Sequence, residues 1–568
     1  MKKILIFSCI YLFGCRSSPD VSFDNLTTAY VSWYFKYHPV ESTRYNMVDN
    51  HGKYMIYEVV EREEYYADIS RFLIELSQID ITKITPKARI DYKILYSNLE
   101  RMKYIMENHR PWEWNPLWSL NEIHDGIYLL SESAGFEMDL RVESVQSRLK
   151  ELPNFLDQAK TLIIGCSKIH ISYANIRIDQ LIILLQTLPI KLYSDNLTLD
   201  AIDILIKQSI DTLQDYKIWL NTNVEKSEDF NFPLKLNLIE SGFQHFVGMK
   251  YVPNAVYGLA IKKMISTQDR LFNLTLPIYL EENDEPVWLD RNDTLEVINW
   301  TISSITENPN NQVESSQVLS QYYESIMEIE EYVYNKHLIL HKKSKSFQLE
   351  FAQDYNQSVN PNFLFDHLSR DVDIDIKYYI SDFNKDLGEY YLIKQEIDIL
   401  NAKNVLPGRG VQLAYARSYP SMIRYLFQDP VAVAGWKAYA VKMLIDEGFK
   451  NWDVEYHILK LREELSAIVS AIVESNYYSG EISRLNAKDY YIKMAFMDSA
   501  KSDIFLMRSD MKYFAGTQSF IGLMELSSLL TEYKRNQEDE FNLSDFHNFI
   551  LSEGIIPYHE LKKQVIYP

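Results

Sequence analysis

The sequence predicts an all-α protein, and two observations carry that prediction. Apolar residues recur at three- and four-residue steps, which places them on one face of a helix, at Val454, Ile458, Leu461, Leu465, Ile468 and Ile472. Strand-like alternation is rare, and short extended pieces are expected only at 252–253 and 277–280. We therefore expect a large helical domain, or two helical lobes around a central cleft, with minor short strands.

Helix-end signals near the C-terminus support this expectation. Asn542 or Ser544 can cap a helix that carries the apolar residues of 546–550. Gly554 then ends that helix and Pro557 follows it. The segment therefore predicts a short terminal helix with both of its ends marked in the sequence.

The N-terminus carries a secretion signal. Lys2 and Lys3 precede a short apolar run, 4–13, that is too short to span a membrane. Leu12-Phe13-Gly14-Cys15 matches a lipobox, which predicts a signal peptide at 1–14, lipidation of Cys15 and a tether at 15–23. The alternative is an ordinary secretory signal with an incidental cysteine. Arg16, in place of Asp, favours sorting to the outer membrane in a Gram-negative envelope.

Charge and cysteine content exclude some function classes. The chain has 568 residues with 58 Lys+Arg against 79 Asp+Glu, a net charge of −21. Nucleic-acid binding needs a basic surface, so we expect no nucleic-acid partner. Cys9 belongs to the signal peptide and Cys15 to the anchor, so Cys166 is left as a buried packing residue without a disulfide partner.

Two polar, loop-rich segments, 281–294 and 306–317, divide the chain. We expect the helical domain to span 24–565, with an N-terminal half at about 24–305 and a C-terminal half at about 306–565. The C-terminal half contains the two segments that are most informative about chemistry.

Those segments are Lys403-Asn404-Val405-Leu406-Pro407-Gly408-Arg409-Gly410-Val411-Gln412 and Ala434-Gly435-Trp436-Lys437-Ala438-Tyr439. They resemble a bacterial lipoprotein family, the domain of unknown function 885 family, whose members carry His-Glu-x-x-Pro-Gly-His-x-x-Gln and then Glu-Gly-Trp-Ala-x-Tyr. The family looks like a distant relative of zinc peptidases (gluzincin-related), which implies a zinc site and a helical fold.

The resemblance extends over most of 24–565 through short pieces in matching order and spacing. They are Trp33-Tyr34, His38-Pro39, Ser42-Thr43, Arg89-Ile90-Asp91-Tyr92, Trp112-Glu113-Trp114-Asn115-Pro116, Arg141, Arg148, Leu152-Pro153, Phe155-Leu156, and Phe546-His547 with Leu551, Gly554, Pro557 and Leu561. Each piece is weak alone, and together they make the resemblance specific.

The departures fall where zinc chemistry would take place. Relative to the family pattern, Lys403 and Arg409 replace two His, and Asn404 and Ala434 replace two Glu. Catalytic zinc needs about three imidazole, carboxylate or thiolate ligands and an activated water. Lys has no acceptor and Arg stays protonated, so these cations disfavour a metal and favour an anion. The resemblance thus implies a degenerate site with no catalytic residue and no zinc.

Two further departures accompany them. Tyr478 falls where the family has a His, and Met507-Arg508-Ser509 replaces a Pro-Gly-Gln before Tyr513. We expect Gln412, Trp436, Tyr439, Tyr478 and Tyr513 to line the remaining cleft.

No other metal or catalytic signature replaces the lost one. His337 and His341 are four residues apart without the Glu that a zincin motif requires, and His559-Glu560 lacks the second His. No nucleophile elbow or Walker loop is present.

The sequence therefore predicts a membrane-anchored, non-catalytic relative of zinc hydrolases that binds or scaffolds a peptide, a glycan or a protein in the cell envelope. One alternative is an active peptide or amide hydrolase with a rearranged site. Another is a structural partner of a second envelope protein.

Overall fold

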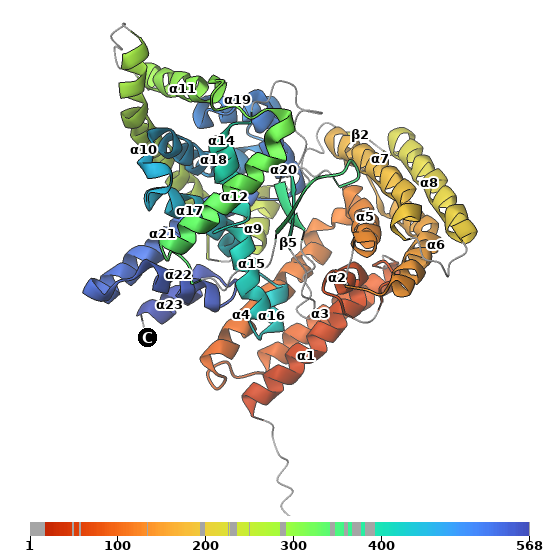
Figure 1. The fold of residues 1–568 in the computed structure, drawn as a ribbon. Coiled ribbons are helices and arrows are strands. Elements are labelled where there is room, and N and C mark those ends of the chain that lie inside the picture. Colours follow the sequence, from red (N-terminus) through yellow and green to blue (C-terminus); the bar gives the residue numbers. More distant parts are fainter. Residues whose placement is uncertain are drawn as a thin grey trace, which may run out of the picture.

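The computed structural model describes residues 18–47, 50–55, 58–132, 135–192, 199–224, 226–227, 236–248, 250–283, 291–340, 347–356, 362–365, 376–380 and 392–566. Helices dominate these ranges, as Figure 1 shows, and the all-α prediction is confirmed. Within them, no helix is both long and apolar enough to span a bilayer. Cys15 lies outside the described residues.

The N-terminal part of the chain, as far as Thr222, forms two groups of helices. The first comprises α1 (Pro19–Tyr37), α2 (Pro39–Arg44), α3 (Val59–Ser77) and α4 (Pro86–Tyr104), which continues as a π-helical turn over Ile105–His109. After a 3-10 turn at Pro111–Glu113, the second comprises α5 (Leu117–Glu132), α6 (Met138–Leu162), α7 (Lys168–Lys191) and α8 (Leu199–Thr222). The second group lies to the right of the first in Figure 1.

The middle of the chain contains four further helices and all of the described strands except β1 (Cys166–Ser167), which lies between α6 and α7. The helices are α9 (Leu236–Phe246), α10 (Pro253–Glu282), α11 (Arg291–Glu307) and α12 (Val318–Asn335), and a 3-10 turn lies at Ser315–Gln317. The other strands are β2 (Lys226–Ser227), β3 (Phe347–Phe351), β4 (Asn362–Phe365) and β5 (Ile376–Ile380).

The strands form two small sheets. β1 and β2 are parallel, with Cys166 opposite Lys226. The other sheet has the order β3-β5-β4, with β3 parallel and β4 antiparallel to β5. Minor strands were predicted, but not at these positions. The expected strand at 277–280 is wrong, because that segment continues α10 through Pro277 and packs Tyr279 against Trp300 at 5.1 Å between ring centroids.

The C-terminal part is a dense helical assembly. Its helices are α14 (Lys394–Asn404), α15 (Arg409–Ser418), α16 (Met422–Leu426), α17 (Pro430–Asp446), α18 (Val454–Tyr478), α19 (Arg484–Ala495), α20 (Ser499–Met511), α21 (Ala515–Gln537), α22 (Leu543–Ser552) and α23 (Tyr558–Ile566). Short 3-10 turns lie at Phe449–Trp452 and Glu538–Glu540.

The predicted helix signals are confirmed. The apolar stripe lies on α18 and is buried except at its first residue, Val454. Asn542 caps α22 by accepting hydrogen bonds from the amides of Ser544 and Asp545, and Gly554 follows with a φ of +81°. Cys166 is fully buried, and burial raises the pKa of its thiol to about 12.

Two hydrophobic cores hold the fold together. The larger core joins α1, α3 and α4 to the C-terminal helices. The smaller one is centred on α5–α8 and also includes Val40, Tyr54, Ala352, Tyr355 and Tyr379. At the centre of the larger core, α17 crosses α21 so closely that a Cβ on Gly435 would lie 2.6 Å from the Cα of Gly522. Glycine is needed at this crossing because the two backbones touch. The crossing fixes α17, which carries Ala434 and Trp436.

Candidate functional site

The frame formed by 403–412 is a helix–turn–helix corner. α14 ends at Asn404, the chain turns through 405–408, and α15 begins at Arg409. Gly408 lies directly over the end of α14, and an added Cβ there would collide with the backbone oxygens of Ala402 and Lys403. The corner therefore requires the glycine of the Pro-Gly pair, and it places Lys403 and Arg409 on either side of the turn.

Trp436 secures this corner from α17. The fully buried indole donates from Nε1 to the carbonyl oxygens of Pro407 at 3.0 Å and Gly408 at 3.2 Å. Gln412 is also buried, and its Nε2 donates to the oxygen of Ala432 at 3.1 Å. Both side chains thus tie the turn and α15 to α17.

Tyr439 and His547 form a second buried link. The His547 Nδ1 donates to the carbonyl oxygen of Leu338 at 2.6 Å, so its Nε2 accepts from the Tyr439 hydroxyl at 2.8 Å. Burial lowers the pKa of His547 to about 4, which keeps the ring neutral. His547 therefore has the packing and hydrogen-bonding role that its position in the family pattern implies.

The replaced positions have polar partners of their own. The Lys403 ammonium is 2.9 Å from Glu463 Oε2. Arg409 donates to Gln412 Oε1 at 2.8 Å and to Gln428 Oε1 at 2.7 Å. Asn404 is buried and Ala434 is half-buried on α17.

Three more cations join Lys403 and Arg409. They are Lys437, one turn after Ala434 on α17, Arg508 on α20, and Lys512 after that helix. The five residues Lys403, Arg409, Lys437, Arg508 and Lys512 are called the cation cluster below. The pKa of Lys437 lies well below its usual value, because the side chain is desolvated and because the other four cations lie around it.

The cluster is short of compensating acids. Burial lowers the pKa of Arg508. Lys512 is exposed to solvent just after α20 and lies within reach of the charges of Arg508 and Arg409. The buried Nε of Arg508 has no hydrogen-bond partner among the described residues. Within the same ranges, neither Lys437 nor Lys512 forms an ion pair.

Two carboxylates lie near the cluster, and both have their own partners. Burial alone would raise the pKa of Glu463, but the charges of Lys403, Lys501 and Arg462 hold it below its usual value. Glu474 accepts from the amides of Gly516 and Thr517, each at 2.9 Å, while burial raises its pKa. A cavity of about 40 Å³ lies between Lys403, Arg508 and these two acids.

These residues do not fit zinc. In the described part of the chain, no three His, Cys, Asp or Glu side chains converge as a metal site requires. At the frame itself, Lys403 and Arg409 offer only donors and Ala434 offers none. The absence of zinc from the protein stays a prediction.

Tyr478 and Tyr513 lie beside the cluster. The Tyr478 hydroxyl donates to the oxygen of Ser509 at 3.0 Å, which holds the end of α18 against α20. The Tyr513 ring packs against Tyr478 and Phe246, each at 5.5 Å between centroids. Gln412, Trp436, Tyr439, Tyr478 and Tyr513 are thus core side chains around the frame, and none of them lines the two larger cavities.

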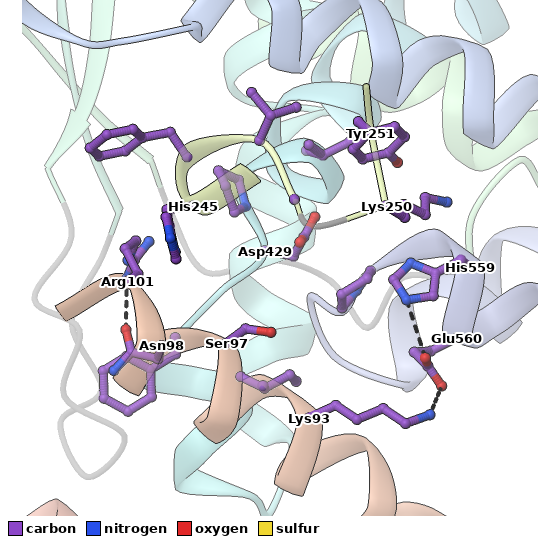
Figure 2. Close-up of a pocket in the computed structure, with 18 of the residues that line it drawn as sticks. Lys93, Ser97, Asn98, Arg101, His245, Lys250, Tyr251, Asp429, His559 and Glu560 are labelled. Carbon is purple, nitrogen blue, oxygen red and sulfur yellow. Dashed lines mark hydrogen bonds and ion pairs between the residues drawn. The ribbon is translucent and has the colours of Figure 1, made fainter. Parts of the chain in front are cut away.

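The first of those cavities, about 240 Å³, lies between α4, the segment after α9 and the C-terminal helices (Figure 2). Gln428 lines it and also accepts from Arg409, so this cavity and the frame share a wall. Among its lining residues, the Glu560 carboxylate lies 2.7 Å from the Lys93 ammonium and 3.2 Å from Nε2 of His559. Asp429 also lines this cavity, and burial raises its pKa to about 6.

Sequence reasoning missed most of the cation cluster. Lys437 occupies the position of the Ala in the family's Glu-Gly-Trp-Ala-x-Tyr, which is a signal in the sequence itself. Arg508 lies within the segment that replaces Pro-Gly-Gln. Lys512 has no such signal, because only the packing of α20 beside α18 and α21 brings it close.

Comparisons with known proteins agree on family and fold. A family model described as bacterial protein of unknown function (DUF885) matches residues 39–565. A protein from Shewanella oneidensis, described as a lipoprotein of unknown function, superposes with a TM-score of 0.77 at 18% identity, covering 96% of this chain and 99% of that one. A protein from Colwellia psychrerythraea, described as a lipoprotein, superposes with a TM-score of 0.77 at 13% identity, and the match covers 97% of this chain and 99% of that one. No curated protein matches.

Proposed function

The chain belongs to the bacterial family of unknown function DUF885, and from this membership we propose a lipid-anchored, non-catalytic member whose former metal frame binds an anion. The observation that carries the proposal is that cations replace family residues at positions close enough for their charges to act on Lys437. Lys403, Arg409, Lys437 and Arg508 all stand at departures from the family pattern, and all lie in the cation cluster.

The electrostatics of the cluster support an anionic ligand. The pKa of Lys437 falls first because its side chain is desolvated, and further because the charges of the other four cations repel its own. An oxyanion between them would remove that repulsion and accept charge-assisted hydrogen bonds. The unpartnered Arg508 Nε and the lysine ammonium groups supply the donors. A carboxylate or phosphate group, on a peptide, a glycan or a smaller ligand, is the chemistry that fits.

The lipobox and the structural relatives support the anchor. Leu12-Phe13-Gly14-Cys15 has the lipoprotein pattern, and both structural relatives are described as lipoproteins. We place the protein in the cell envelope, held to a membrane by acyl groups on Cys15, and Arg16 favours the outer membrane.

Phosphate titration tests the anion site. Detergent-solubilised mature protein is titrated with inorganic phosphate by calorimetry at low ionic strength. Lys437→Gln should weaken phosphate binding by at least about tenfold, since it removes a charge at the centre of the cluster. Lys442→Gln is the matched control, because Lys442 lies on the same helix and pairs with Asp446 outside the cluster. Equal weakening in both variants, or no binding to the parent, refutes the site.

Elemental analysis and peptide hydrolysis test the loss of catalysis. Protein purified without a metal-binding tag should contain no stoichiometric zinc and should not cleave a peptide library. One zinc per chain with chelator-sensitive cleavage would establish the rearranged hydrolase instead. Co-purification of a stoichiometric envelope protein, with no phosphate binding, would favour the structural-partner alternative.

A further inference from the structure

A second large cavity lies on the N-terminal side of the molecule. Its volume is about 330 Å³, and α1, α3, α4 and the 111–118 segment surround it. It shares the lining residues Asn98, Arg101 and Phe246 with the cavity of Figure 2. An apolar cavity of about 150 Å³ accommodates benzene, so this volume fits an aromatic ring with a short chain.

The walls of this cavity, called the aromatic cavity below, are mainly rings. Tyr34, Tyr37, Tyr65, Trp112, Trp118 and Phe246 contribute them. Several of the rings are held in place: Tyr34 stacks on His38 at 4.3 Å between centroids, and His38 Nε2 is 3.0 Å from the Tyr65 hydroxyl. A fixed aromatic wall favours a flat apolar ligand that stacks on it.

Three buried donors among the lining residues have no partner. The indole Nε1 atoms of Trp112 and Trp118 and the Nε of Arg62 are buried and form no hydrogen bond to any described residue. Trp112 as a whole is only 7% exposed. Indole and guanidinium nitrogens only donate, so the polar groups of this wall favour a ligand that carries acceptor oxygens. Buried donors are rarely left unpaired in native proteins.

The charge of the lining residues also favours an anionic ligand. Arg62 and Arg101 line the aromatic cavity, and no Asp or Glu is among the described residues of its lining. Arg101 donates to Asn98 Oδ1 at 2.7 Å, and neither arginine forms an ion pair with a described carboxylate. The Arg62 guanidinium lies over the Trp112 ring, 5.7 Å from its centroid, so a positive charge and an aromatic ring lie together in one part of the cavity wall.

We propose that the aromatic cavity binds an aromatic carboxylate. The ring stacks against the tyrosine and tryptophan side chains, and the carboxylate pairs with the guanidinium groups of Arg62 and Arg101 that line the cavity. The ligand is either a small aromatic acid or the C-terminal residue of a peptide, since both present the same chemistry. This site is separate from the cation cluster, and no residue of the cluster lines it.

Binding of 3-phenylpropionate to the full mature chain tests the proposal. Quenching of tryptophan fluorescence and calorimetry report the affinity. The neutral 3-phenylpropionamide has the same shape and should bind at least about tenfold more weakly, because it lacks the charge. Equal affinity of acid and amide, or no binding of the acid at millimolar concentration, overturns the proposal.

Two substitutions locate the ligand. Arg62→Gln should weaken 3-phenylpropionate binding by at least about tenfold. Arg71→Gln on the same helix should leave it unchanged, because Arg71 pairs at the surface with Asp68 and Glu75. If Arg62→Gln fails to fold, as circular dichroism would show, Arg101→Gln replaces it. A folded Arg62 or Arg101 variant that binds like the parent refutes the assignment.

A peptide arm separates the two sources of the carboxylate. Ala-Ala-Phe with a free C-terminus is compared with its C-terminal amide and with 3-phenylpropionate. Tighter binding of the free peptide identifies a peptide end as the ligand, and exclusion of the peptide identifies a small acid. Lys437→Gln should leave all of these affinities unchanged, so a failure at the cation cluster and a failure here are distinguishable.

Discussion

Trp436→Phe tests whether the indole N–H secures the corner that carries Lys403 and Arg409. The substitution keeps a ring in the core but removes the donor to the oxygens of Pro407 and Gly408. Leaving buried acceptors without this donor costs roughly 1–3 kcal/mol. The smaller ring also leaves a void of roughly 40 Å³, which at about 24 cal/mol per Å³ adds about 1 kcal/mol.

The expected loss in the free energy of unfolding is therefore roughly 2–4 kcal/mol. Urea unfolding followed by circular dichroism measures it, and the first transition is compared because chains of this length often unfold in several steps. Trp452→Phe is the control: Trp452 is 60% exposed, so its substitution should change the stability by less than about 0.5 kcal/mol. If both variants unfold at the same urea concentration as the parent, the indole does not secure the corner.

Three further predictions concern the frame, its buried histidine and the anchor. Gly408→Ala should destabilise the protein by more than about 3 kcal/mol through its backbone clash, whereas Gly258→Ala, with open space around the added Cβ, should stabilise by up to about 1 kcal/mol in the same urea assay. The pKa of His547 is lowered from 6.5 in the unfolded chain to about 4 in the folded protein. The contribution of the neutral ring to the free energy of unfolding is therefore fully present above pH 6.5 and is lost as the pH falls toward 4. The loss in the free energy of unfolding between pH 6.5 and pH 4 is at most about 3 kcal/mol. It should be smaller in His547→Gln, which has no group that titrates there. Identical plots of stability against pH for the parent and this variant would contradict the prediction. Cys15→Ala should release the protein from sedimented membranes, and a variant processed and bound like the parent would disprove lipidation.

The predictable parts of the fold are those that local sequence determines. The stripe on α18 and the Asn542 cap depend on spacing and on a single side chain, and both were predicted correctly. Pro277 misled the strand prediction, since proline usually ends a helix. Here the apolar residues around it keep helical spacing, and the contact between Tyr279 and Trp300 holds that turn within α10.

The candidate sites depend on tertiary structure, so the sequence predicts them only in part. Lys403 and Arg409 stand out because a motif surrounds them, and Lys437 could have been found in the same way. The aromatic cavity has no motif: Tyr34, Trp112 and Phe246 come from separate elements, and only their packing leaves a volume between them. The unpaired state of Arg62 Nε is likewise a property of the fold and not of any residue pattern.

Charge balance connects the zinc site that the family resemblance implies to the proposed anion. In the family pattern, two neutral His and two Glu carry a charge of about −2, which a Zn²⁺ ion would neutralise. Here Lys403 and Arg409 bring two positive charges, while Asn404 and Ala434 remove both negative ones. Relative to that pattern the sign of the charge is reversed, which is the charge-balance argument for the proposed anion. Glu463 offsets only part of this charge, because Lys437, Arg508 and Lys512 add to it. Loss of metal binding alone would require only neutral residues at these positions. The presence of several cations therefore favours binding of a new ligand over loss of function alone.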